Sequence, residues 1–169
     1  SFQMKNRFYF GYNGKKTPGH WLTDYKILNI LKKYQENYQI VFKDYPGIGS
    51  PNLWKTVLKD INAENILYES NQKNLYNLLS NSDLVILPNM SSAFFDALYF
   101  DGDIFAIDED LYEKPFQQKL KNEIFYFKDM NKLEIYLDKY LKEGKFSRNI
   151  KKNSKNYFLN FDELNNREK

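Results

Sequence analysis

Two adjacent serines after an apolar run are the residues of this sequence best suited to bind a ligand. Ser91 and Ser92 follow the run 84–87 and open a stretch with helical spacing. A helix amino terminus offers free backbone N–H groups and a partial positive charge, which favour a phosphate. Asp96, one turn further on, could accept hydrogen bonds from a sugar or ribose hydroxyl. The spacing is equally consistent with a serine that only caps the helix and an aspartate that only complements its dipole.

Basic residues follow two other apolar runs. Lys43 ends one of them and could neutralise phosphate charge, although a solvated lysine fits the pattern equally well. The loop 12–20 holds Gly14, Lys15 and His20, the only histidine, which could donate to a phosphate or carry a proton. A helix-start or surface position is the alternative for His20. The glycines of this loop lack the spacing of a Walker loop or of a dinucleotide-binding fingerprint.

The other chemistry-bearing residues give little support to a metal site or a hydrolase. The chain has one histidine, no cysteine and no serine in a Gly-x-Ser-x-Gly turn, which argues against zinc sites and Ser-His-Asp catalysis. Five acidic residues could gather around a divalent cation, but a solvated acidic loop explains them better. They are Asp101, Asp103, Asp108, Glu109 and Asp110. We therefore expect neither a metal nor a cofactor.

Alternating strand and helix patterns position these loops. Short β-branched and aromatic runs alternate with stretches of helical spacing. The predicted strands are 7–11, 38–43, 65–68, 83–87, 103–107 and 124–127. The predicted helices begin near Trp21 and at Pro51 and cover 75–79, 91–99, 111–120, 133–141 and 146–161. The alternation predicts an α/β fold, a Rossmann-like three-layer domain with a mostly parallel sheet of about six strands and helices on both faces. Ligands of such folds lie at the carboxyl ends of the strands.

Length and composition limit the class of protein. The chain of 169 residues suffices for one domain; residues 1–4 are interpreted as an expression-vector scar and residues 5–169 as the domain. The 25 basic and 22 acidic residues give a net charge of +3 without a sustained basic stripe, so no nucleic-acid partner is expected. The lack of cysteine is compatible with a reducing compartment, and no apolar run is long enough to span a membrane. We expect a cytoplasmic protein, either free or at the inner face of the membrane.

One part of the sequence resembles a known family. It contains Ser82-Asp83 before an apolar run, the serine pair, Phe95-Asp96-Ala97-Leu98 and a second apolar run at 104–107. This order resembles the carboxyl-terminal, donor-binding half of GT-B glycosyltransferases, notably bacterial surface-carbohydrate transferases and CDP-glycerol glycerophosphotransferases.

The resemblance implies a function and a set of donor-binding residues. In those families the serines bind the phosphates of the donor, a nucleotide-sugar or a nucleotide-activated polyol. The chain is thus expected to be a nucleotide-sugar-binding domain excised from a longer, two-domain transferase of bacterial surface-polysaccharide or capsule biosynthesis. The acceptor-side catalytic base usually belongs to the amino-terminal domain, which is missing here, so this domain alone should be inactive.

Lys43 and Pro46 are similar to the Lys-x-His-Pro element of the glycerophosphotransferases, with Tyr45 at the position of the histidine. The expected donor-binding residues are Ser91, Ser92, Lys43, Asp96, Asn89, Gly14, Lys15 and His20.

Two other functions stay open. Half of a nonhydrolysing sugar-nucleotide epimerase would share the two-domain architecture and would act on the donor without any acceptor. A non-catalytic flavodoxin- or receiver-like module would bind FMN or accept a phosphoryl group on an aspartate. A receiver needs acidic residues near the first strand, and this chain has Lys5 and Arg7 there.

Overall fold

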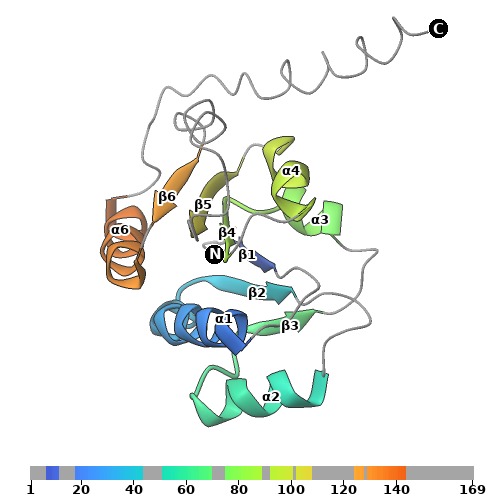
Figure 1. The fold of residues 1–169 in the computed structure, drawn as a ribbon, viewed down its shortest axis with the longest axis vertical. Coiled ribbons are helices and arrows are strands. Elements are labelled where there is room, and N and C mark those ends of the chain that lie inside the picture. The colour runs from blue at the N-terminus through green and yellow to red at the C-terminus, as the bar shows by residue number, and fades with distance from the viewer. Residues whose placement is uncertain are drawn as a thin grey trace, which may run out of the picture.

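The computed structural model describes one sheet and the helices around it (Figure 1). The residues that it describes are 7–11, 18–43, 51–69, 75–88, 92–100, 102–107, 124–127 and 129–143. The expected helices at 111–120 and 146–161 and the expected scar at 1–4 lie outside these residues. Within the described ranges, no helix is long and apolar enough to cross a membrane.

Six strands alternate with helices along the chain. The strands are β1 (Arg7–Gly11), β2 (Gln39–Lys43), β3 (Leu67–Glu69), β4 (Leu84–Leu87), β5 (Asp103–Ile107) and β6 (Phe125–Phe127). The helices are α1 (Pro18–Leu31), the 3-10 turn η1 (Lys32–Tyr34), α2 (Pro51–Asp60), α3 (Leu75–Ser80), α4 (Ser92–Leu98) and α6 (Met130–Glu143).

The strands form one sheet in the order β3-β2-β1-β4-β5-β6, and every pairing is parallel. The chain runs outward from β1 to β3 and then returns to place β4 on the other side of β1. The strand order therefore reverses between β1 and β4. The predicted α/β class with parallel strands is confirmed.

The apolar core lies on both faces of this sheet. Alternate residues of a strand point to opposite faces, and Leu84 and Ile86 belong to one buried cluster whereas Val85 and Leu87 belong to the other. The first cluster contains buried residues of α1, α2 and α6, and the second contains those of α3 and α4. The helices thus cover both faces, as Figure 1 shows.

Three elements begin two or more residues away from the positions expected from the sequence. Helix α1 begins at Pro18 and not near Trp21, because proline suits the first helical position. Strand β3 begins at Leu67 and not at residue 65, because the Asn65 N–H donates to the side chain of Gln35 at 3.2 Å and not to a neighbouring strand.

The third boundary is that of α6, which begins three residues before the expected 133–141. The carboxylate of Asp129 accepts the N–H of Lys132 at 2.8 Å. This bond satisfies one of the free amides of the first turn, and the helix therefore begins at Met130.

Candidate functional site

The carboxyl edge of the sheet beside β1 and β4 is the candidate site. In open parallel sheets, ligands lie outside the carboxyl ends of the strands at the point where the strand order reverses. That point is the boundary between β1 and β4. Helices α1 and α4 follow these two strands along the chain, so their amino termini face the same edge.

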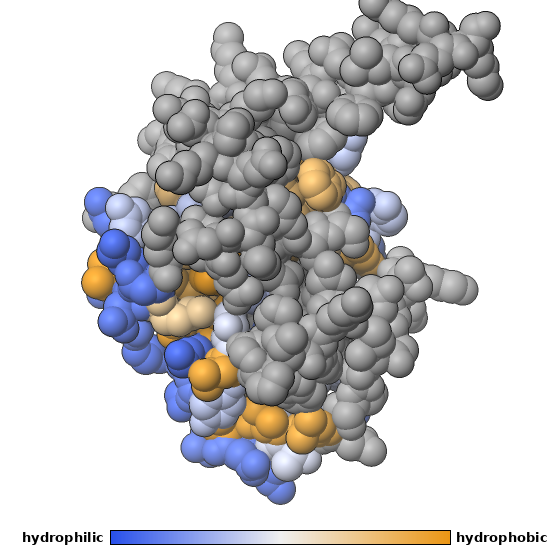
Figure 2. All heavy atoms as spheres, viewed as in Figure 1, coloured by the Kyte–Doolittle hydropathy of each residue, from blue (hydrophilic) through white to orange (hydrophobic). Residues whose placement is uncertain are grey.

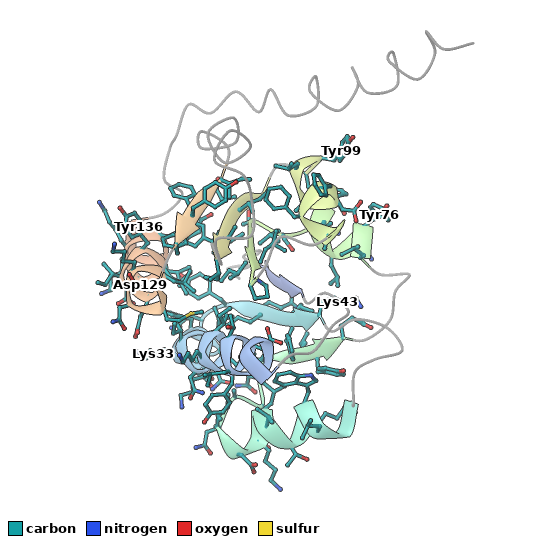
Figure 3. The ribbon with its side chains drawn as sticks, viewed as in Figure 1. Lys33, Lys43, Tyr76, Tyr99, Asp129 and Tyr136 are labelled. Carbon is teal, nitrogen blue, oxygen red and sulfur yellow. The ribbon has the colours of Figure 1, made fainter. Side chains whose placement is uncertain are left out.

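Lys43 is a buried cation at this edge. It is the last residue of β2, lies in register with Gly11 of β1 and Glu69 of β3, and is only 4% exposed. Phe42, the preceding residue, points into the cluster under α1 and α2, so the alternation of the strand directs Lys43 toward the face that carries α3 and α4. Figure 3 shows Lys43 at the end of β2.

The burial of Lys43 makes it more than a solvated surface charge. Charged groups in an interior need partners, and a lysine ammonium carries three N–H donors. It can therefore serve an anionic ligand in addition to groups of the protein. The sequence predicted Lys43 at the end of a strand but did not predict whether its side chain is buried or exposed.

Helix α4 carries two of the expected residues. Ser92 is its first residue, and Asp96 follows one turn later and is half-buried. The hydroxyl of Tyr76, from α3, lies 3.4 Å from Oδ1 of Asp96 and donates to it. Tyr76 and Tyr99 project from the outer side of α3 and α4 (Figure 3). Sequence reasoning missed Tyr76 because no local pattern links residues twenty positions apart.

The expected site residues are described to different extents. Lys43 and Asp96 are described with their side chains, and Ser92 is placed by its backbone in α4. His20 lies in the first turn of α1, so the helix-start alternative holds and the position in the preceding loop does not; Pro18 starts the helix two residues earlier. The others lie outside the described residues: Ser91, Asn89, Gly14 and Lys15.

The pair Ser82-Asp83 belongs to the segment whose sequence resembles a known family. It lies at the opposite, amino edge of the sheet. The hydroxyl of Ser82 donates to the carbonyl of Leu78 at 2.6 Å, and the Asp83 carbonyl accepts the N–H of Asp103 at 2.8 Å. These bonds close the end of α3 and join the starts of β4 and β5. The pair therefore has a structural role, remote from the candidate ligand site.

Tyr140 of α6 belongs to the same amino edge. Its hydroxyl donates to Oδ2 of Asp103 at 2.9 Å and lies 3.4 Å from the Asp83 carbonyl. Burial, followed by the charge of Asp103, raises the pKa of Tyr140 well above its ordinary value. A neutral hydrogen-bonded tyrosine of this kind holds α6 to the sheet.

The acidic residues considered for a cation do not form a site where the structure describes them. Asp103 is engaged by Tyr140. The other four, Asp101, Asp108, Glu109 and Asp110, lie outside the described residues. Within the described part of the chain, no three His, Cys, Asp or Glu side chains gather around a common point.

The sequence matches no protein-family model and no curated protein. The structure, in contrast, is similar to solved structures of low sequence identity. One is the C-terminal domain of a group 1 glycosyl transferase family protein, LpcC, from Francisella tularensis. The TM-score is 0.54 and the identity 12%, over 81% of this chain and 75% of that one.

Two further neighbours come from other functional classes. A putative UDP-N-acetylglucosamine 2-epimerase from Listeria monocytogenes gives a TM-score of 0.58 at 15% identity, over 98% of this chain but only 46% of the epimerase. The molybdenum cofactor binding protein from Rippkaea orientalis gives 0.57 at 13% identity, over 83% of this chain and 99% of that protein. At these identities the likeness establishes a shared fold and does not establish a shared function.

Proposed function

We propose that this chain is the donor-binding domain of a glycosyltransferase that acts in bacterial surface-polysaccharide biosynthesis. The observation that carries the proposal is a buried lysine, Lys43, beside the point where the strand order reverses. A cation there suits the diphosphate of a nucleotide-sugar or of a nucleotide-activated polyol. The similar fold of a glycosyltransferase C-terminal domain supports the same assignment.

The chemistry of donor binding follows from the groups at this edge. Lys43 would neutralise phosphate charge, and the amino terminus of α4, with Ser91 and Ser92, would donate hydrogen bonds to phosphate oxygens. Asp96, held by a hydrogen bond from Tyr76, would accept a hydrogen bond from a hydroxyl of the ribose or the sugar. Fixed donors of this kind stabilise the negative charge that develops on the leaving nucleotide.

An exposed apolar rim supports the proposal that a second, acceptor-binding domain covers this edge. Leu22, Leu53, Tyr76 and Phe95 are 53%, 42%, 63% and 37% exposed. Each lies within the first five residues of its helix, α1 to α4 in turn, and each helix follows a strand. These positions therefore surround the carboxyl edge, and exposed apolar groups gathered in this way indicate a contact surface.

Figure 2 shows hydrophobic atoms at the surface over α2, at the bottom of the view. The covering domain would be the amino-terminal half of the transferase. It would supply the acceptor site and the catalytic base.

Calorimetric titration of the chain at low salt with CMP, CDP, UDP and GDP tests the proposal. We expect one diphosphate to bind and Lys43→Gln to weaken its binding by about tenfold to a hundredfold, since hydrogen bonds to charged groups contribute roughly 1.5–3 kcal/mol. Lys59→Gln, an exposed lysine of α2, is the matched control and should bind as the wild type does.

Circular dichroism must show that both variants are folded. Failure of every nucleotide to bind to the folded wild type would refute donor binding. Equal affinity of wild type and Lys43→Gln would remove Lys43 from the site.

An epimerase is the second candidate, favoured by the similar fold of the Listeria enzyme. The two functions differ in their need for an acceptor. Full-length protein that epimerises a UDP-sugar with no acceptor present would establish the epimerase, whereas an unchanged sugar under those conditions favours transfer. FMN in the calorimetric series tests the flavodoxin-like alternative.

A further inference from the structure

The last residues of β2 and β3 place a glutamate beside the buried lysine of the candidate site. In the parallel pairing of these two strands, Lys43 is the register partner of Glu69. Neighbouring strands lie about 4.8 Å apart, and register partners project from the same face of the sheet. The side chains of Lys43 and Glu69 are therefore neighbours on one face, at the carboxyl edge.

Contacts on the opposite face support this arrangement. Phe42 and Tyr68 are the preceding register partners, and their rings pack edge-on with centroids 5.7 Å apart. The ring of Phe42 also packs edge-on against Trp54 of α2, at 4.7 Å. Because successive residues of a strand alternate between faces, this packing directs Lys43 and Glu69 together to the other face.

The two neighbouring side chains differ in burial. Lys43 is 4% exposed, whereas Glu69 is half-buried, because β3 is the first strand in the order of the sheet. Burial disfavours the charged form of a lysine, and an adjacent carboxylate favours it. A half-buried glutamate keeps part of its hydration, so the pair loses less hydration than one buried on both sides.

The other described ionisable side chains of this region bind each other or lie on the other face. Of the described residues in α3 and α4, only Tyr76 and Asp96 are ionisable, and Tyr76 donates to Asp96. Asp24 is buried on the same side of α1 as Ile27, which packs on the opposite face of the sheet. Glu69 is thus the carboxylate that the strand register places next to the lysine.

We propose that Glu69 is a positioning residue of the donor site, whose carboxylate holds the ammonium of Lys43 charged and in place for the phosphates of the ligand. This role rests on the proposed function, in which Lys43 binds phosphate. Glu69 itself would not touch the phosphates, since like charges repel. Simple repulsion predicts that removal of the Glu69 charge strengthens phosphate binding, whereas positioning predicts that it weakens binding.

Calorimetric titration at low salt with the nucleoside diphosphate that binds the wild type tests this role. We expect Glu69→Gln to weaken binding by about tenfold at pH 7 and by more at pH 9, because a buried lysine without a neighbouring carboxylate loses its proton more readily. Glu69→Asp keeps the charge and should bind more tightly than Glu69→Gln. In the background of Lys43→Gln, the added change Glu69→Gln should cause no further loss.

The matched control is Glu64→Gln, which removes one negative charge from an exposed position before β3. It should bind as the wild type does, and circular dichroism must show that each variant is folded. Unchanged or tighter binding by Glu69→Gln, or a further loss in the background of Lys43→Gln, would overturn the role of Glu69.

An NMR titration of the Lys43 ammonium in the chain without nucleotide separates this role from donor binding. We expect the pKa of Lys43 to be lower in Glu69→Gln than in the wild type by roughly one pH unit or more. A lowered pKa together with no nucleotide binding by the wild type would refute donor binding and still support the pairing of Glu69 with Lys43. An unchanged pKa would refute the pairing, whichever nucleotides bind.

Discussion

At the scale of single residues, Gly102 is a position where the backbone leaves no room for a side chain. A Cβ there would lie 2.5 Å from the carbonyl oxygen of Ser82 and 3.3 Å from that of Asp83. The Asp83 oxygen cannot move freely, because it accepts the Asp103 N–H and thereby joins β4 to β5. The glycine is therefore required by the close approach of two strand starts.

We expect Gly102→Ala to lower the free energy of unfolding by roughly 1–3 kcal/mol, the usual cost of forcing atoms into a packed site. Urea denaturation followed by circular dichroism measures it. Lys59→Ala, at an exposed position of α2, is the control and should change stability by less than about 0.5 kcal/mol. Equal midpoints for Gly102→Ala and the wild type would contradict the close packing described here.

The candidate site residues show how much of the site can be predicted from residue types alone. Lys43, Ser92 and Asp96 were predicted because each follows an apolar run or occupies the start of a helix, and parallel sheets place such positions at one edge. The contact between Tyr76 and Asp96 could not be predicted, because it depends on how α3 and α4 pack. The burial of Lys43 likewise depends on the strands beside it.

At the scale of elements, α6 is attached to the sheet by a tyrosine whose ionisation depends on folding. Tyrosine in an unfolded chain ionises near pH 10. In the folded protein, burial and then the charge of Asp103 raise the pKa of Tyr140 above that value. The stabilisation is therefore fully present below pH 10 and is lost as pH rises above it.

Tyr140→Phe removes both the hydrogen bond and this pH dependence. At pH 7 we expect the variant to be less stable than the wild type by about 1–2 kcal/mol. Between pH 10 and 11 the difference should narrow, because only the wild type has to keep Tyr140 neutral. Urea unfolding at both pH values measures this, and a difference that widens with pH would contradict the assignment.

Element boundaries were predicted best where the residues at the ends are decisive. Helix α2 begins at Pro51 as predicted, because proline fits the first helical turn, and β5 covers 103–107 as predicted. The predicted start of β3 was wrong because the Asn65 N–H bonds to the side chain of Gln35, which lies outside the sheet. Contacts of this kind leave no periodic signal in the sequence.

At the scale of the whole molecule, the order of the strands decides where a ligand can bind. Sequence alternation predicted parallel strands, but the same pattern is compatible with several orders. The observed order puts the reversal at β1 and β4, and with it Lys43 and the start of α4 at one edge. The same order puts the Ser82-Asp83 pair at the other edge of the sheet. The sequence resemblance had grouped this pair with the serines of the expected ligand site.

The most direct test of donor binding is an NMR titration of the labelled chain with the nucleoside diphosphate that binds best. The account predicts that the largest amide shifts occur at the carboxyl edge, at Gly11, Lys43 and Ser92. Shifts concentrated at the amino edge, at Asp83 and Asp103, or the absence of saturable shifts with every nucleotide, would contradict it.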